Sequence, residues 1–134
     1  MVRYLKLDDL RPNNWFLDRA KLNAIREIWK RGEQYLLPAV LVTLIDSEYG
    51  LIDGHCRAYV ALENGIREIA AELVEPSEIE YRLEWLTIFH RQGPFVGVKH
   101  VQDLGKRIID AKKLEERPVR ISQRLKRDIV LLTK

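Results

Sequence analysis

The stretch Leu51-Ile-Asp-Gly-His-Cys-Arg-Ala-Tyr-Val-Ala-Leu62 decides the fold of this chain. It begins as a short apolar strand, breaks at Asp53-Gly54, and continues with Ala58, Ala61 and Leu62 at helical spacing. The residues just after the break are therefore expected on the first turn of a helix. Backbone N–H groups there have no partner within the helix, and the helix dipole is positive.

This turn contains the residue types that a phosphate-binding turn needs. Gly54 lets the backbone approach a ligand closely, and Arg57 supplies a fixed cation with a planar set of donors. A glycine turn that leads into a helix N-terminus is a common phosphate cradle. An ordinary strand-to-helix connection with a solvated His55 and Arg57 has the same spacing, because short glycine motifs are frequent by chance. Spacing alone leaves both interpretations open.

Composition indicates one soluble globular domain. The chain has 134 residues, of which 46% are hydrophobic and 32% are charged. No apolar run approaches the roughly 20 residues of a membrane span, and the N-terminus has a strand pattern, without a signal-peptide core. Its single cysteine, Cys56, cannot form an internal disulfide, which is typical of a reducing compartment. We therefore expect a cytoplasmic protein without a membrane partner.

The net charge of +3 is unevenly distributed. Residues 1–75 carry 10 Lys and Arg against 12 Asp and Glu, whereas residues 76–134 carry 13 against 8. A basic C-terminal part can bind nucleic acid, but it can equally be the polar face of ordinary helices. The side chains that would follow a phosphate backbone are Arg117, Arg120, Arg124, Lys126 and Arg127.

Periodicity places further elements on both sides of the central stretch. Asp18 is a candidate N-cap for a helix that ends at Gly32, and a buried strand follows Pro38. From Ser77 the pattern is helical, with apolar stripes over 79–89, 101–111 and 121–132. We expect an α+β core over 1–76, with a helical extension over 77–134 packed on it. The predicted strands cover 4–7, 39–45, 51–52 and 69–74, with a turn over 46–50.

This order of elements resembles the ParB/sulfiredoxin superfamily over about residues 3–75. The resemblance is carried by Leu37-Pro-Ala-Val-Leu-Val42, by Ile52-Asp-Gly-His-Cys-Arg-Ala-Tyr59, and by the spacing to Glu63-Asn-Gly-Ile-Arg-Glu-Ile69. It implies an α+β fold with a small mixed sheet and packed helices. It also implies that the phosphates of a nucleotide bind the Gly-x-x-Arg turn. This nucleotide is CTP in ParB proteins and ATP in sulfiredoxin.

Carried over by position, the resemblance gives a set of site residues. ATP, ADP or CTP would bind together with Mg²⁺. The implied contacts to the nucleotide and its phosphates are Gly54, His55, Cys56, Arg57, Asn13 and Pro38.

The details of the motif distinguish branches of the superfamily. Sulfiredoxin has Gly-Cys-His-Arg, with its nucleophilic cysteine directly after the glycine, whereas here His55 has that place and Cys56 follows. Cys56 is therefore misplaced for sulfiredoxin chemistry, although a helix terminus and Arg57 are groups that activate a thiol. A partitioning ParB typically has Gly-Glu-Arg-Arg and additional domains. The Asp-Gly-His-x-Arg form is more similar to the ParB-like free-serine kinases.

That branch implies a phosphotransferase that acts on a small-molecule hydroxyl. Its catalytic base is a glutamate in the loop after the first strand, where this chain has Asn13, Asn14 and Asp18. Asp18 is then either a base or a helix cap, and Asp53 would hold Mg²⁺ or accept a hydroxyl proton. The leading hypothesis is a nucleotide-binding domain of this kinase type. The alternatives are a DNA-binding ParB-like module that uses the basic C-terminal helices and a catalytically silent interaction domain.

Overall fold

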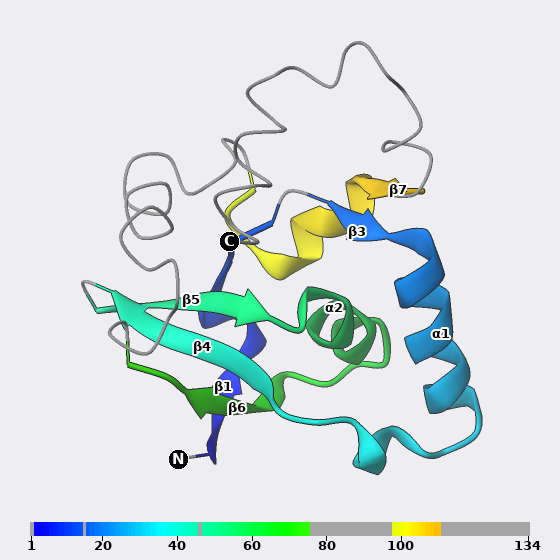
Figure 1. Ribbon diagram of the computed structural model, residues 1–134, viewed down its shortest axis with the longest axis horizontal. Coiled ribbons are helices and arrows are strands. Elements are labelled where there is room, and N and C mark those ends of the chain that lie inside the picture. The colour runs from blue at the N-terminus through cyan, green and yellow to red at the C-terminus, as the bar shows by residue number, and fades with distance from the viewer. Residues whose placement is uncertain (1, 15, 46, 76–97, 111–134) are drawn as a thin grey trace, which may run out of the picture.

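The computed structural model describes residues 2–14, 16–45, 47–75 and 98–110 (Figure 1). This part of the chain contains both helices and strands, which agrees with the predicted α+β class. The elements are β1 Val2–Lys6, η1 Leu7–Asp9, β2 Leu10–Pro12, β3 Leu17–Asp18, α1 Arg19–Lys30, η2 Gln34–Leu36, β4 Val40–Ile45, β5 Glu48–Asp53, α2 His55–Glu63, β6 Glu68–Leu73, η4 Val101–Lys106 and β7 Ile108–Ile109.

Five strands form one mixed sheet in the order β1-β6-β4-β5-β2. The pairs β1–β6 and β4–β5 are antiparallel, whereas β4–β6 and β2–β5 are parallel. The central strand β4 comes from the predicted apolar run, and its Val40 and Val42 are fully buried. The predicted fold class, an α+β domain with a small mixed sheet, is confirmed. A second, two-stranded sheet pairs β3 with β7 in parallel.

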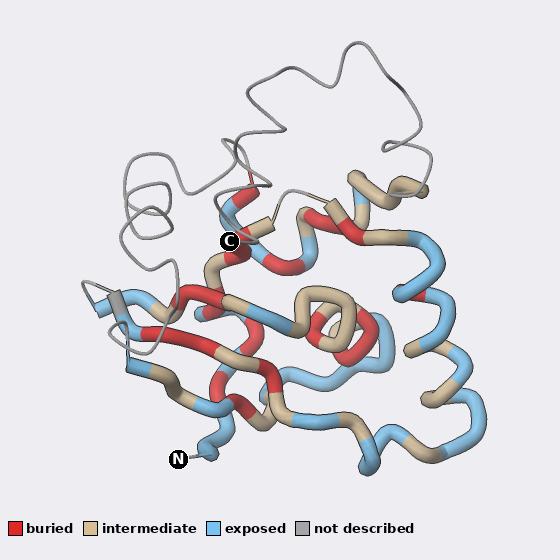
Figure 2. The backbone as a smooth tube through the Cα atoms, in the orientation of Figure 1, coloured by how far each residue is buried: buried red, intermediate tan, exposed pale blue. Residues whose placement is uncertain are grey.

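Helix α2 lies between the large sheet and α1 (Figure 1). Its buried residues are Ala58, Val60 and Ala61, and the small alanines let the helix pack closely on its neighbours. The buried stretches gather in the centre of the sheet and in α2, while most of α1 is exposed or half-buried (Figure 2). The position of α2 is thus fixed on several sides by packing.

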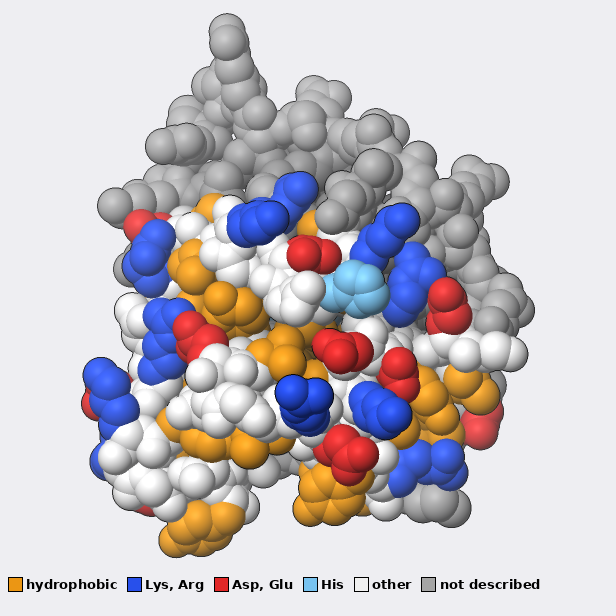
Figure 3. Space-filling model, turned by 180° about the vertical axis from the view of Figure 1, so that it is seen from behind, with side chains coloured by type: hydrophobic (Ala, Val, Ile, Leu, Met, Phe, Trp, Pro, Cys, Tyr) orange, Lys and Arg blue, Asp and Glu red, His pale blue; other side chains and the backbone are white. Residues whose placement is uncertain are grey.

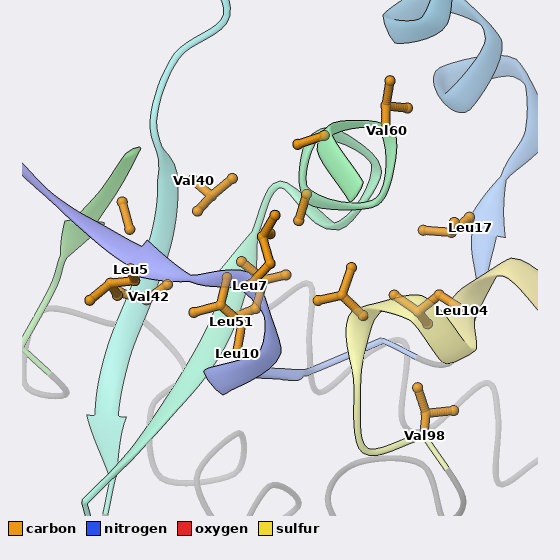
Figure 4. Close-up of a cluster of buried hydrophobic side chains, with 14 of the residues drawn as sticks. Leu5, Leu7, Leu10, Leu17, Val40, Val42, Leu51, Val60, Val98 and Leu104 are labelled. Atoms are coloured by element: carbon orange, nitrogen blue, oxygen red, sulfur yellow. The ribbon is translucent and has the colours of Figure 1, made fainter. Parts of the chain in front are cut away.

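The core also includes part of the chain that follows residue 97. Val98, Val101 and Leu104 are buried in the same apolar cluster as the side chains of the large sheet (Figure 4). Gly105 lies so close to the ring of Tyr59 on α2 that a Cβ at this glycine would collide with the Tyr59 hydroxyl. The segment 98–110 therefore packs directly against α2.

Two predicted elements differ from the structure. The turn predicted over 46–50 is shorter, since β5 already begins at Glu48 and Ser47 has a positive φ of 68°. The amphipathic helix predicted over 101–111 is wrong, because η4 ends at Lys106 and β7 follows. There the N–H of Leu17 donates to the carbonyl of Arg107 over 2.9 Å, so pairing with β3 replaces a further helical turn.

The helices predicted over 79–89 and 121–132 lie outside the described residues. Among the helices of the described ranges, none has the length and apolar character to traverse a bilayer.

Candidate functional site

The turn between β5 and α2 has the predicted arrangement of strand, glycine and helix. Gly54 is the N-cap residue of α2 and has a φ of 103°, which is the left-handed region. No side chain in the described ranges caps this helix, and the carbonyl of Gly54 accepts from the N–H of Ala58 over 2.9 Å. The N–H groups of residues 55–57 precede that bond, so they have no acceptor within the helix.

Gly54 is also required by packing. A Cβ at this position would lie 2.6 Å from Cγ1 of Val40 and 2.9 Å from Nη2 of Arg57. Both distances are shorter than van der Waals contact, and a side chain rarely adopts this φ. The first turn of α2 is therefore pressed against the start of β4 with no space for a side chain between them.

Arg57 fastens this turn to the residues that precede β4. Its Nη1 donates to the carbonyl oxygens of Pro38 over 2.8 Å and Ala39 over 3.1 Å. Its Nη2 lies 3.5 Å from Oδ2 of Asp53, and the Arg57 side chain is only 13% exposed. Arg57, which is predicted to bind phosphate, therefore also has a structural role, and its charge lies at the N-terminus of α2.

His55 connects α2 to the loop that follows β2. Its Nε2 accepts a hydrogen bond from the backbone N–H of Asn13 over 2.9 Å. Burial lowers the pKa of His55 to about 4, Asp53 opposes this lowering, and Arg57 adds to it. Both observations indicate a neutral imidazole at neutral pH, with Nε2 as the acceptor and the proton on Nδ1.

Asn13 is almost fully enclosed at this junction. The residue is 6% exposed, and its Oδ1 has no hydrogen-bond partner among the described residues. Its neighbour His55 is the first residue of α2, so Asn13 lies against the first turn of that helix. An acceptor that is buried without a donor is unusual in a folded protein.

Cys56 points to a different neighbourhood, at the start of α1. Burial raises the pKa of its thiol, and this effect exceeds the opposing effects of the Asp18 backbone and of Lys21 and Arg26. Burial therefore works against the activation that a helix terminus and Arg57 would favour, because it disfavours the thiolate.

The two candidate carboxylates have different surroundings. Asp53 is 71% exposed and lies next to Arg57 at the end of β5. Asp18 occupies the N-cap position of α1 as predicted, but its side chain forms no capping hydrogen bond. Across the described ranges, no group of three or more His, Cys, Asp or Glu side chains is suited to hold a metal ion.

The structure thus separates the predicted site residues into two groups. Cys56 and Asp18 lie together towards α1. The other group lies around the first turn of α2, where the structure brings together Asn13, Pro38, Asp53, Gly54, His55 and Arg57.

The contacts of Arg57 with Ala39, and of Gly54 with Val40, were not predicted, because backbone carbonyls and close packing have no sequence motif.

Charge in the described part of the chain is balanced. The described ranges contain 13 Lys and Arg and 13 Asp and Glu, so the whole net charge of +3 belongs to the other residues. On the face shown in Figure 3, basic and acidic side chains are interspersed. The predicted nucleic-acid contacts at Arg117, Arg120, Arg124, Lys126 and Arg127 lie outside the described residues.

Comparison with known proteins places the chain by its fold. Neither the family models nor the curated proteins give a match. Among solved structures, the chain is similar to protein Atu1540 from Agrobacterium tumefaciens, with a TM-score of 0.60 and 15% identity. That similarity covers 98% of this chain and 79% of Atu1540.

Two further solved structures have lower similarity to the chain. Sulfiredoxin from Arabidopsis thaliana has a TM-score of 0.47 and 19% identity, covering 62% of this chain and 97% of sulfiredoxin. A Pnob8-like ParB-N domain has a TM-score of 0.47 and 14% identity, covering 90% of this chain and 50% of that chain. At these identities the similarity concerns the fold alone.

Proposed function

We propose that this chain binds a phosphate group of a nucleotide at the N-terminus of α2. The observation that carries the proposal is Gly54, a left-handed N-cap whose helix has no side-chain cap among the described residues. Ser, Thr, Asp and Asn usually fill this position and satisfy the first N–H groups themselves. With glycine there, the N–H groups of residues 55–57 are left for an external acceptor such as a phosphate oxygen.

The charges around the turn favour a phosphate that binds together with a metal ion. The helix dipole and the Arg57 guanidinium attract a phosphate, whereas the carboxylate of Asp53 opposes one. Mg²⁺ typically binds one or two carboxylates together with substrate phosphates, rather than a full set of protein ligands. The exposed Asp53 beside the turn fits such a role, and Mg²⁺ would offset the charge of both the phosphates and Asp53.

Phosphoryl transfer to a small-molecule hydroxyl is the finer form of this proposal. Asp53 is the better candidate to act on the substrate hydroxyl or the metal, because it is exposed beside the turn. Asp18 lies beside the Cys56 thiol at the start of α1. Incubation with ATP, Mg²⁺ and free serine should yield ADP and phosphoserine, and Asp53→Asn should abolish both products.

Thermal unfolding in the presence of ligands tests phosphate binding. Inorganic phosphate, ATP, ADP and CTP are each added with and without Mg²⁺, and a ligand that binds only the folded chain raises Tm. We expect a rise of several degrees with at least one nucleotide at saturation. Arg57→Lys should reduce this rise, while Arg67→Lys, an exposed arginine before β6, serves as the matched control.

The alternatives give different results in the same experiment. If no nucleotide changes Tm while duplex DNA binds with a steep salt dependence, the chain is a DNA-binding module. If neither ligand class binds, it is a silent interaction domain. The zero net charge of the described ranges favours the nucleotide over a nucleic-acid surface in this part of the chain.

A further inference from the structure

Strand β1 forms one edge of the large sheet, and the described strands provide no neighbour for its outer side. It is five residues long, contains no proline, and pairs with β6 without a shift in register. The opposite edge, β2, is three residues long and ends at Pro12, which cannot donate to a further strand. Proteins commonly protect a sheet edge with short strands, prolines or bulges, because its unpaired backbone groups bind other strands. Within the described ranges, β1 is the less protected edge.

The direction of the backbone groups in β1 follows from its pairing with β6. The N–H of Leu7 donates to the carbonyl of Arg67 over 2.9 Å, and this pair continues the register of the two strands. In an antiparallel pair, residues that bond to the neighbouring strand alternate with residues whose backbone groups point away from it. Counting back from Leu7, the N–H and C=O groups of Val2, Tyr4 and Lys6 point outwards, while those of the alternate residues bond to β6.

The same residues also have exposed side chains. Tyr4 is 71% exposed and Val2 is 59% exposed. Both lie on the face of the sheet opposite to the buried Leu5, because successive side chains of a strand alternate between faces. A strand that pairs along this edge would therefore satisfy the outward backbone groups and cover both apolar side chains.

We propose that the outer edge of β1 pairs with β1 of a second copy of this chain, antiparallel and about a two-fold axis at Tyr4. In this register Tyr4 is opposite Tyr4 of the other copy, and Val2 is opposite Lys6. All three outward-facing residues then exchange N–H···O bonds with their counterparts. A two-fold contact uses the same surface on both copies, which this edge can provide. The contact uses no residue of the first turn of α2, so it is independent of the phosphate site.

Charge complementarity favours a second copy as the occupant. In the proposed register, Lys6 of one copy lies beside Val2 of the other, and the neighbour of Val2 on β6 is Glu72. Lys6 also pairs with Glu68 on β6 of its own copy, so each lysine lies in a row with a glutamate on both sides. Opposite charges on neighbouring strands stabilise a sheet, and like charges destabilise it. A register shifted by two residues would instead place Arg3 opposite Arg3.

The centre of the contact suits an aromatic pair. The two Tyr4 rings would lie side by side on one face of the joined sheet, and cross-strand aromatic pairs are favourable. The neighbour of Tyr4 on β6 is Ala70, a small residue that leaves space for the rings. Because a single short strand contributes a small area, we expect a reversible dimer with a Kd on the order of 10–100 µM.

Sedimentation and amide hydrogen exchange test the proposal on the unmodified chain. Between about 5 µM and about 500 µM the chain should change from mainly monomer to mainly dimer. Over this range the amides of Tyr4 and Lys6 should become protected, whereas those of Arg3 and Leu5 should keep their protection because they bond to β6. A chain that stays monomeric would overturn the second copy as the occupant and would leave this edge to a strand of a different protein.

Charged variants of Tyr4 assign the dimer to this register. Tyr4→Lys and Tyr4→Glu each place like charges opposite one another, so either variant alone should dimerise about tenfold more weakly. An equimolar mixture of the two places lysine opposite glutamate and should recover most of the affinity. Tyr35→Lys, which replaces a 77% exposed tyrosine on η2, is the control and should leave the dimer unchanged.

Three results would contradict this interface even if a dimer forms. In the first, Tyr4→Lys weakens the dimer no more than Tyr35→Lys does. In the second, the mixture of charged variants associates no better than either variant alone. In the third, dimerisation leaves the exchange of the Tyr4 and Lys6 amides unchanged.

Discussion

The backbone N–H of Asn13 donates to Nε2 of His55 over 2.9 Å and joins two residues that are 42 positions apart. This hydrogen bond selects the tautomer of His55 and holds the loop after β2 against the first turn of α2. Arg57 secures the opposite side of the turn through the carbonyls of Pro38 and Ala39. The turn between β5 and α2 is thus held by two long-range contacts.

The stability of the chain should depend on pH through His55. Its pKa is about 4 in the folded chain, against an ordinary value of 6.5, because burial penalises the charged ring. Above pH 6.5 the imidazole is neutral in both states and its full contribution is present. Between pH 6.5 and 4 the unfolded chain binds a proton that the folded chain does not. The free energy of unfolding therefore decreases as the pH is lowered through this range.

Urea unfolding of wild type and His55→Gln at pH 7.0 and pH 4.5 checks this dependence. Glutamine does not titrate in this range. The carboxyl groups of the chain titrate in both proteins, so their effect cancels in the difference. The advantage of the wild type should shrink by about 2 kcal/mol at the lower pH. The same difference at both pH values would show that His55 has an ordinary pKa.

Gly54→Ala should destabilise the chain more than Gly65→Ala. Both glycines have a positive φ, of 103° and 77°, so both substitutions introduce backbone strain of about 1 kcal/mol. A Cβ at Gly54 would also collide with Val40 and Arg57, whereas a Cβ at Gly65 meets nothing within 4 Å. We expect at least about 2 kcal/mol more loss at Gly54, measured by urea unfolding. Equal losses would mean that the turn is not pressed against β4.

Arg57→Lys should weaken the start of β4 as well as any ligand site. An ammonium group cannot reproduce the guanidinium geometry that reaches both the Pro38 and Ala39 carbonyls and Asp53. The expected loss is about 1–2 kcal/mol, with faster amide hydrogen exchange in residues 39–41. Arg67→Lys is the control for the loss of an arginine. Unchanged exchange in 39–41 would show that Arg57 does not hold this segment.

The thiol of Cys56 should react slowly. Since burial raises its pKa, the thiolate fraction at pH 7.5 is smaller than that of an ordinary cysteine. Alkylation by iodoacetamide should be at least about tenfold slower in the folded chain than in the same chain unfolded in urea. A native rate equal to or above the unfolded rate would restore Cys56 as an activated nucleophile.

Local elements of the site could be predicted from the sequence, because they depend on neighbouring residues. Gly54 followed by a helical period indicates a turn into a helix whatever the rest of the chain does. The α-helix predicted from the spacing of Val101 and Leu104 is wrong, since three-residue spacing suits a 3₁₀ turn as well as an α-helix. The pairing of β7 with β3 is nonlocal and leaves no periodic signal over two residues.

The contacts that define the site could not be predicted in the same way. Arg57 binds backbone carbonyls 18 and 19 positions away, and any residue has a carbonyl. The resemblance placed Asn13 and His55 in one site, but the hydrogen bond between them follows from the path of the chain after β2. The raised pKa of Cys56 depends on burial at the start of α1, which the motif alone does not specify.

The most direct test of the central claim is an NMR titration of the ¹⁵N-labelled chain with inorganic phosphate and with ADP plus Mg²⁺. We predict that the amide signals of residues 55–57 shift first and saturate, together with the Asn13 signal. If ligand shifts these signals no more than those of Gly65 and its neighbours at the other end of α2, the phosphate site proposed at Gly54 does not exist.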